Sequence, residues 1–245
     1  SVKALLTSSA PATKQMKLDV MKLFNKTKLF EAYGSTEAGL VTLLRPEDQM
    51  KKLGSIGKEC IGTDCIKLLD EDGKPVTVGE IGELYSRGPQ MFDEYYKLLE
   101  KTKESFKGEY FSAGDMGKKD EDGFYYLVDR KANMIITGGE HVYPSEVEEV
   151  VVSHPLVVEC AVVGLHDYKW GESVTAVCVL NKDAGSPDPN IFNKEMRQYC
   201  EDKLARFKIP KSFLCINSEE MPRTGSGKVI HRRLRERFDE QLNNK

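Results

Sequence analysis

The sequence predicts a mixed α+β protein made of two regions, and three observations support this fold class. Residues 53–128 alternate short apolar segments with glycine turns, which is typical of antiparallel strands. From residue 129 onward, helical apolar patterns alternate instead with Val-rich runs. The 245 residues are enough for one or two domains, each with its own core. We therefore expect a boundary near 128–130, between a region 1–128 and a region 129–245.

Composition and charge are those of an ordinary soluble chain. Hydrophobic residues make up 40% and charged residues 31%, and a net charge of −3 gives no electrostatic attraction to nucleic acid or anionic membranes. No apolar run is long enough to span a bilayer, and the apolar start is too short for a signal peptide. The six cysteines include no CxxC and the four histidines no i,i+4 pair. We therefore expect reduced, structural cysteines, no His/Cys metal site and a cytoplasmic protein.

The first region opens with a helix and a strand. Apolar residues at helical spacing between lysines predict a helix over 13–28, and the short apolar run 29–33 predicts a strand. Alternating segments predict further strands, and Asp/Gly clusters predict hairpin turns because these residues tolerate the backbone angles of tight turns. The strands are expected at 65–69 and 82–86, and the turns at 70–73 and 120–123.

The second region alternates helices with strands. Pro144 followed by acidic residues is typical of a helix start, because proline suits the first turn and acids suit the positive end of the helix dipole. The later patterns predict, in order, buried strands at 158–164 and 173–180, a helix at 189–205, a strand at 212–216 and a charged helix at 229–243. This order fits a compact α+β unit.

Two polar segments of the first region are candidate nucleotide contacts. Gly34-Ser35-Thr36-Glu37 follows an apolar strand; its hydroxyls and N–H groups suit phosphate oxygens, and its carboxylate suits Mg²⁺. Asp115 follows a tight glycine turn, and a carboxylate there suits two vicinal ribose hydroxyls because it only accepts hydrogen bonds. Alternatively, the first segment is a strand-to-helix turn capped by a hydroxyl, and Asp115 is an ordinary turn aspartate.

Two further segments lie at or just after the expected boundary. Asp129-Arg130-Lys131 joins regions of different character, so Asp129 is a candidate hinge and Arg130 a candidate clamp on ribose or phosphate. A surface salt bridge is the alternative. Gly138-Gly139-Glu140 permits close approach of the backbone to a ligand, although it is not part of a GxGxxG motif.

The segment Met-Pro-Arg-Thr-Gly-Ser-Gly-Lys, which ends at Lys228, places a lysine at the tip of a flexible loop. Pro222 and Val229 stand where a Walker A motif requires Gly and Ser or Thr, so the segment is not a P-loop. Lys228 is either a mobile cation for phosphate and carboxylate groups or a solvated lysine. The basic run 231–237 is either a nucleic-acid patch or a solvated helix face. The acidic balance of the chain favours the helix face, so we expect no nucleic-acid partner.

In this order, the segments resemble the C-terminal half of the adenylate-forming superfamily, which includes fatty-acyl-CoA synthetases, 4-coumarate-CoA ligases and luciferase. The blocks match in register across nearly the whole chain, so a chance match is negligible. They are Tyr33-Gly34-Ser35-Thr36-Glu37, Gly82-Glu83-Leu84 with Gly88, Tyr110 to Asp115, Asp129-Arg130, Gly138-Gly139-Glu140 with Tyr143 to Glu148, and Pro222 to Lys228.

The resemblance implies a fold and a set of roles. Residues 1–128 would be the end of a large N-terminal α/β region with a small β-barrel-like subdomain, and 129–245 a hinged, compact α+β domain. Glu37 would bind Mg²⁺ with Thr36 nearby, Asp129 would be the hinge, and Lys228 would bridge the carboxylate and the α-phosphate during adenylation. The nucleotide would contact Tyr33, Gly34, Ser35, Thr36, Asp115 and Arg130, and CoA would contact Gly138, Gly139 and Glu140.

The resemblance also implies an activity, that of an ATP-dependent acid–CoA ligase of fatty acid metabolism that uses ATP/AMP, Mg²⁺ and CoA. Residues 138–140 and 205–210 are closer to the fatty-acyl branch, which predicts a medium- or long-chain acid. The phosphate loop of the family is not in these residues. We therefore expect a C-terminal fragment or shortened form whose partner is the missing N-terminal part. The alternatives are a non-catalytic regulatory or interaction fragment of the same fold, or an adenylating enzyme with a non-CoA acceptor.

Overall fold

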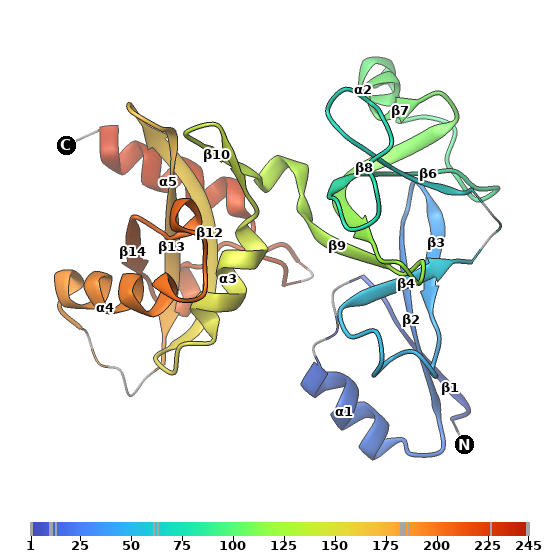
Figure 1. Cartoon of the computed structure of the whole chain (residues 1–245), viewed down its shortest axis with the longest axis horizontal. Coiled ribbons are helices and arrows are strands. Elements are labelled where there is room, and N and C mark those ends of the chain that lie inside the picture. The colour runs from blue at the N-terminus through green and yellow to red at the C-terminus, as the bar shows by residue number, and fades with distance from the viewer. Residues whose placement is uncertain are drawn as a thin grey trace. The chain divides into compact units, whose positions relative to one another are not determined.

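Two compact units make up the protein (Figure 1). The computed structural model describes residues 2–243 apart from 10, 11, 13, 61, 63, 182–184, 186 and 226, and it describes no side chains in 241–243. Unit 1 is Ser1–Lys131 and unit 2 is Ala132–Lys245, so the division falls just past the expected boundary. Helices and sheets occur in both units, which confirms the mixed α+β class.

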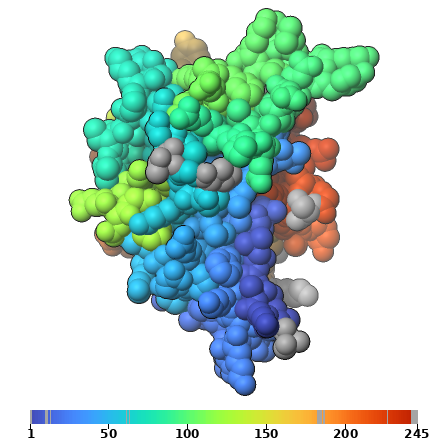
Figure 2. Space-filling model, turned by 90° about the vertical axis from the view of Figure 1, so that its right-hand side faces the viewer, coloured from blue at the N-terminus to red at the C-terminus, as the bar shows by residue number. Residues whose placement is uncertain are grey.

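Unit 1 is built on one large sheet with two short helices. Its strands are β1 (Ala4–Thr7), β2 (Lys28–Ser35), β3 (Gly39–Leu44), β4 (Ser55–Glu59), β5 (Ile66–Leu69), β6 (Gly82–Ser86), β7 (Phe106–Lys107), β8 (Tyr110–Lys119) and β9 (Tyr125–Arg130). The helices are α1 (Lys14–Leu23) and α2 (Leu99–Glu104). The strand order is β1-β2-β3-β4-β9-β8-β6-β5, with β7 beside β8. On the face shown in Figure 2, the blue N-terminal residues and the green residues around α2 lie at opposite ends of this unit.

The expected helix over 13–28 is α1, but its buried side is not the apolar one. Leu23 is 78% exposed and Met16 52%, whereas Lys17 is only 1% exposed. The Lys17 ammonium lies 2.5 Å from Glu31 Oε2 on β2, and this partner compensates the burial of both charges. Apolar spacing therefore located the helix, while its buried residue is a lysine.

Both expected turns of unit 1 form, with different roles. The 120–123 turn joins β8 to β9 as a hairpin, in which Gly123 N donates to Asp120 O at 3.0 Å. The 70–73 turn instead leads into a single bridge between Leu69 and Pro75, and a longer connection follows before β6. The 70–73 turn is therefore a chain reversal inside the connection between β5 and β6.

Unit 2 places helices around a smaller sheet. Its strands are β10 (Ile135–Thr137), β11 (Glu140–Val142), β12 (Val157–Asp167), β13 (Gly171–Leu180) and β14 (Ser212–Cys215). Its α-helices are α3 (Pro144–Val152), α4 (Pro189–Glu201) and α5 (His231–Asn243), and short 3₁₀ turns lie at Arg206–Lys208 and Ser218–Glu220. A further 3₁₀ turn, Lys131–Asn133, crosses the division between the units. The strand order is β11-β10-β13-β12, with β14 parallel to β13.

Successive residues of β12 enter two separate hydrophobic clusters, which explains the continuous apolar run seen in the sequence. Val162 packs with residues of α3 and α4, whereas Ala161 and Val163 pack with Leu234 and Phe238 of α5. Because neighbouring side chains on a strand point to opposite faces, both faces of this strand are covered. The sheet is therefore the middle layer of unit 2.

Two predictions from composition concern these described residues. Among them, no helix is long and apolar enough to cross a bilayer. None of the six cysteines, all of which are described, forms a disulfide. Cys160, Cys178 and Cys200 are buried, whereas Cys60 and Cys215 are exposed.

Candidate functional site

A buried carboxylate with two partners lies at the centre of the candidate site in unit 1. Asp115 on β8 is 8% exposed and stands opposite Arg130 on β9 in the strand register. The Arg130 Nε atom lies 2.9 Å from Asp115 Oδ1, and Tyr33 Oη donates to Asp115 Oδ2 at 2.6 Å. The structure therefore brings together three residues that the sequence analysis took from separate blocks.

Asp115 lies inside a strand and not after a tight turn as expected. β8 continues from Tyr110 to Lys119, and the register against β6 shifts in the segment that contains Gly114, whose φ is 80°. A bulge of this kind redirects the following side chains and is well served by glycine. The irregularity, together with the pairing to β9, aims Asp115 at Tyr33 and Arg130.

The Asp115 cluster retains capacity for a ligand. Burial and the neighbouring Asp115 carboxylate raise the pKa of Tyr33 above its usual range, so the phenol stays protonated and donates. A carboxylate offers about four lone-pair positions, and Tyr33 and Arg130 use one on each oxygen. The remaining positions suit two neighbouring hydroxyl donors, such as those of a ribose.

The polar segment after β2 is a hairpin that leads into β3, so the strand-to-helix turn considered from the sequence is wrong. Ser35 and Gly39 are paired across the hairpin, and Ser35 Oγ accepts a hydrogen bond from Ala38 N at 3.0 Å. A Cβ added to Gly34 would lie 2.0 Å from the Gly39 carbonyl oxygen, so only glycine fits there. This closure leaves Thr36 exposed and Glu37 half-buried at the turn.

The Glu37 carboxylate is held by a tyrosine that the sequence analysis did not single out. Tyr95 Oη donates to Glu37 Oε1 at 2.9 Å. Partial burial alone would raise the pKa of Glu37, but hydrogen bonds from Tyr95, the backbone and Ser35, together with the charge of Lys101, lower it overall. Burial and the Glu37 carboxylate raise the pKa of Tyr95 to about 12, so a neutral phenol faces an ionised carboxylate at neutral pH.

Glu37 fits Mg²⁺ as one ligand among several that a substrate would supply. Within the described part of the chain, no group of three or more His, Cys, Asp or Glu side chains is arranged to hold a metal ion. Mg²⁺ is commonly bound by one or two carboxylates together with waters and substrate phosphates, and not by a complete protein cage. Tyr95 donates to Oε1 and not to Oε2, so Oε2 is the oxygen that this hydrogen bond leaves open to such an ion.

Asp129 and Arg130 end β9 and are not part of an irregular linker. Asp129 pairs with Met116 in the sheet, and its Oδ1 accepts a hydrogen bond from Arg130 N at 2.6 Å. The next residue, Lys131, lies 2.9 Å from Glu83 Oε2, and the division between the units follows it. Asp129 therefore lies at the end of a strand just before the division between the units, and its role as a hinge stays a prediction.

The glycine pair of unit 2 forms the tight turn between β10 and β11. Gly138 and Gly139 have φ values of 60° and 86°, and Thr137 pairs with Glu140 across the turn. Gly138 N donates to Trp170 O at 2.8 Å, and a Cβ at position 138 would lie 2.7 Å from the Trp170 ring. Trp170 thus adjoins the glycine pair, which the sequence did not reveal because the two segments are far apart along the chain.

Lys228 lies in a segment held by a β-bridge and an ion pair. Arg223 and Val229 form a bridge, so the lysine stands one residue before the bridge and not at the tip. Thr224 N donates to Lys228 O at 2.8 Å, and Arg223 Nη2 lies 2.5 Å from Glu159 Oε2. The Lys228 side chain is exposed, and Ser226 of the same motif lies outside the described residues. The backbone of the lysine is thus well fixed while its ammonium is accessible.

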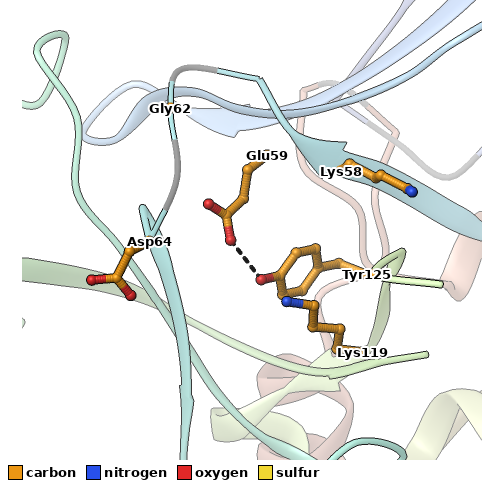
Figure 3. Close-up of a pocket in the computed structure, with 7 residues that line it drawn as sticks. Lys58, Glu59, Gly62, Asp64, Lys119 and Tyr125 are labelled. Carbon is orange, nitrogen blue, oxygen red and sulfur yellow. Dashed lines mark hydrogen bonds between the residues drawn. The ribbon is translucent and has the colours of Figure 1, made fainter. Parts of the chain in front are cut away.

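A separate pocket of about 360 Å³ in unit 1 contains none of the residues expected from the sequence (Figure 3). Its lining residues are Lys58, Glu59, Gly62, Asp64, Lys119, Gly123 and Tyr125. Tyr125 Oη donates to Glu59 Oε1 at 2.7 Å, and burial followed by the Glu59 carboxylate raises the pKa of Tyr125. Cys65 N donates to Glu59 Oε2 at 3.0 Å, so this carboxylate links Tyr125 to the backbone at Cys65.

Comparison with known proteins gives a consistent result along the chain. The family model described as "AMP-binding enzyme" matches residues 1–96, and that described as "AMP-binding enzyme C-terminal domain" matches residues 146–228. A medium/long-chain-fatty-acid–CoA ligase, FadD8 of Mycobacterium tuberculosis, is 40% identical over 84% of this chain and 36% of its own length. A 2-succinylbenzoate–CoA ligase of Bacillus cereus is 33% identical over 98% of this chain and 47% of its own length.

Solved structures agree with the sequence relatives. The o-succinylbenzoate CoA synthetase of Bacillus subtilis, in complex with its acyl-adenylate intermediate, is 34% identical with a TM-score of 0.77 over 94% of this chain and 45% of its own. The same enzyme in complex with ATP and magnesium ion gives a TM-score of 0.78 over 95% of this chain and 46% of its own. The chain thus spans less than half the length of the proteins it matches.

Proposed function

This chain belongs to the adenylate-forming enzyme superfamily, and from that premise we propose that it serves as the C-terminal part of an ATP-dependent acid–CoA ligase. In the first half-reaction, a carboxylate oxygen bonds to the α-phosphorus of ATP and pyrophosphate leaves. In the second, the CoA sulfur bonds to the acyl carbon of the acyl-AMP, the thiol proton is released and AMP leaves.

The observation that carries this proposal is the Tyr33–Asp115–Arg130 cluster. A buried carboxylate with free lone pairs suits the two ribose hydroxyls of the nucleotide, because each hydroxyl can donate one hydrogen bond. The Arg130 guanidinium keeps Asp115 paired, and its exposed part is available to a phosphate. Tyr33 fixes the second oxygen of the carboxylate, which orients the acceptor pair.

Glu37 and its turn are proposed to serve the phosphates. The exposed Thr36 hydroxyl and the N–H groups of the Gly34–Gly39 hairpin suit phosphate oxygens. The Glu37 carboxylate, ionised at neutral pH, is proposed to hold Mg²⁺ through Oε2. When bound, that ion supplies positive charge against the phosphate oxygens.

Residues of unit 2 are proposed to serve the two half-reactions in turn. A carboxylate that approaches an α-phosphate meets like charge, and the Lys228 ammonium between the two anions lowers that repulsion. The Gly138–Gly139–Glu140 turn is proposed to serve the thioester step, in which CoA must reach the acyl carbon. A change between two arrangements about Asp129 allows the lysine to leave before the thiol enters.

The proposal does not specify which carboxylic acid is the substrate. The relatives act, by their names, on medium- and long-chain fatty acids and on 2-succinylbenzoate, so the family spans aliphatic and aromatic acids. Residues 138–140 and 205–210 favour the fatty-acyl branch, and this preference stays a prediction. We therefore propose a carboxylic acid substrate without restricting it to fatty acids.

The deciding experiment supplies preformed acyl-AMP and CoA to the chain and measures acyl-CoA above the rate without protein. A panel of fatty-acyl and 2-succinylbenzoyl adenylates reports the acid class through its rates. Turnover that disappears in Asp115→Asn supports the proposed nucleotide site. Absence of turnover from folded protein that also fails to bind AMP would overturn the proposal and favour a non-catalytic fragment of this fold.

A further inference from the structure

The Glu37 turn is held by a second segment of unit 1, residues 90–105, which runs from the loop after β6 into α2. Gln90 Oε1 accepts a hydrogen bond from Leu40 N at 3.1 Å, and Phe92 N donates to Glu37 O at 2.8 Å. The third contact is the Tyr95 hydroxyl on the Glu37 carboxylate at 2.9 Å. Both the backbone and the side chain of Glu37 therefore depend on this segment.

We propose that Tyr95 is a positioning residue that orients the Glu37 carboxylate for Mg²⁺. This inference rests on the proposed function, in which Glu37 holds the ion. Mg²⁺ requires near-ideal octahedral geometry and keeps several waters, so a carboxylate serves it best with one oxygen in a fixed direction. The Tyr95 hydroxyl holds Oε1 and thereby sets the direction of Oε2.

The phenol can set this direction because Tyr95 is itself fixed at both ends. Its backbone N donates to Thr102 Oγ1 at 3.0 Å, and Thr102 is 8% exposed. Its ring packs edge-on against Phe92 with centroids 4.8 Å apart, and Phe92 packs in turn against Phe111. Phe92 thus contacts the Tyr95 ring through its side chain and the Glu37 carbonyl through its backbone.

The chemistry of the donor also suits a cation site. A lysine or arginine in the same place would orient the carboxylate equally well, but its charge would repel the metal ion. A neutral phenol donates without adding a further positive charge to that of Lys101, which already acts on the Glu37 carboxylate. Lys101, whose ammonium lies 4.3 Å from the centroid of the Tyr95 ring, packs on the ring face, while the hydroxyl points to Glu37.

Tyr96 provides a matched control. It is the next residue in the same segment and is 81% exposed, with Lys97 Nζ 5.1 Å from its ring centroid. The substitutions Tyr95→Phe and Tyr96→Phe each delete one hydroxyl and retain the ring. Only the first deletes a donor to the Glu37 carboxylate.

The test measures ATP affinity of the full chain by calorimetry, once with saturating Mg²⁺ and once with EDTA. Tyr95→Phe is expected to weaken binding of Mg²⁺·ATP by about ten-fold, the lower end of what loss of a ligand-orienting hydrogen bond costs in metal sites. Its affinity without metal should equal that of the unchanged chain. Tyr96→Phe should match the unchanged chain under both conditions.

The outcomes separate this inference from the function on which it rests. If the unchanged chain binds no ATP, or binds it equally with and without Mg²⁺, the metal role of Glu37 fails and the inference falls with it. If Mg²⁺ strengthens ATP binding equally in the unchanged chain and in Tyr95→Phe, the inference alone is overturned. Weaker binding by Tyr95→Phe under both conditions, with a lower melting temperature, would also overturn it, because the hydroxyl would then be only structural.

Discussion

The exposed ammonium of Lys228 leads to a prediction that distinguishes the two proposed half-reactions. Its proposed role is to reduce repulsion between two anions, and those anions meet only during adenylation. In the complete enzyme, Lys228→Ala should slow adenylation by about 10²–10³-fold, the range for loss of one transition-state donor, and largely spare thioester formation from supplied acyl-AMP. Pyrophosphate release and acyl-CoA formation report the two half-reactions separately.

Lys194 is the matched control for this test, because it is an exposed lysine on α4 of the same unit. Lys194→Ala should leave both half-reactions unchanged. Equal loss of both half-reactions in Lys228→Ala would contradict a role limited to adenylation.

Asp115 makes a different kind of prediction, about which part of the nucleotide is recognised. Its carboxylate is proposed to accept hydrogen bonds from the ribose hydroxyls, so AMP should bind more tightly than 2′,3′-dideoxy-AMP. Hydrogen bonds to charged groups contribute about 1.5–3 kcal/mol, so the preference should be about ten-fold or more. Asp115→Asn should abolish most of this preference, as competitive binding of the two nucleotides can measure. An unchanged preference would place ribose recognition elsewhere.

At the residue scale, motifs singled out the three residues that cluster at Asp115 but did not predict the other contacts of the candidate residues. Asp115 and Arg130 came from two blocks of the sequence, and the register of β8 on β9 makes them neighbours. The Tyr95–Glu37 and Gly138–Trp170 contacts were missed, because each joins residues whose proximity depends on tertiary folding. Nothing in local spacing distinguishes Tyr95 from the exposed Tyr96 beside it.

The β10–β11 hairpin allows a prediction at the scale of one element. Gly138 and Gly139 both have positive φ, so alanine at either position is strained by about 1–3 kcal/mol. At position 138 the new Cβ would also lie 2.7 Å from the Trp170 ring, whereas at position 139 it would meet nothing within 4 Å. Gly138→Ala should therefore reduce the free energy of unfolding by about 1–3 kcal/mol more than Gly139→Ala does.

Chemical denaturation of both variants measures this difference. Adding Trp170→Ala to each variant supplies the control, since removal of the ring should erase the extra cost at position 138 alone. Equal costs for the two single variants would mean that the Trp170 ring moves away freely.

Sequence periodicity located most elements, and the misplaced features have physical causes. The helix α1 was expected from apolar spacing, yet Lys17 is its buried residue because Glu31 lies in reach on β2. The turn after β2 was open between two interpretations, and the pairing of Ser35 with Gly39 makes it a β-hairpin. The burial of Lys17 and the pairing of Ser35 each depend on a residue of another strand. The pattern of apolar residues within one segment does not contain this information.

At the scale of the whole molecule, ordered motifs were enough to identify the superfamily. The two family models match residues 1–96 and 146–228, although the chain spans less than half the length of the relatives named above. The acid was less predictable. Relatives named for different acids match 84% and 98% of this chain, so the match by itself does not distinguish one acid from another.

Separate hydrophobic cores in the two units lead to the last prediction. Leu84 is 2% exposed within a cluster of unit 1 residues, and Leu234 is 0% exposed within a cluster of unit 2 residues. A Leu→Ala substitution in a core costs about 2–5 kcal/mol, because it removes buried apolar surface and leaves a cavity. If each unit is stabilised by its own core, this loss should remain in the unit that carries the substitution.

Amide hydrogen exchange, read peptide by peptide, measures where the loss falls. Leu84→Ala should reduce protection in β6, β8 and β9 and leave β12 and β13 unchanged, whereas Leu234→Ala should do the reverse. The two substitutions are chemically identical and similarly buried, so each serves as the control for the other. Reduced protection of both units in either variant would show that they unfold together. In that case, the two sheets would belong to one cooperative unfolding unit. The division after Lys131 would then separate two compact units that do not unfold independently.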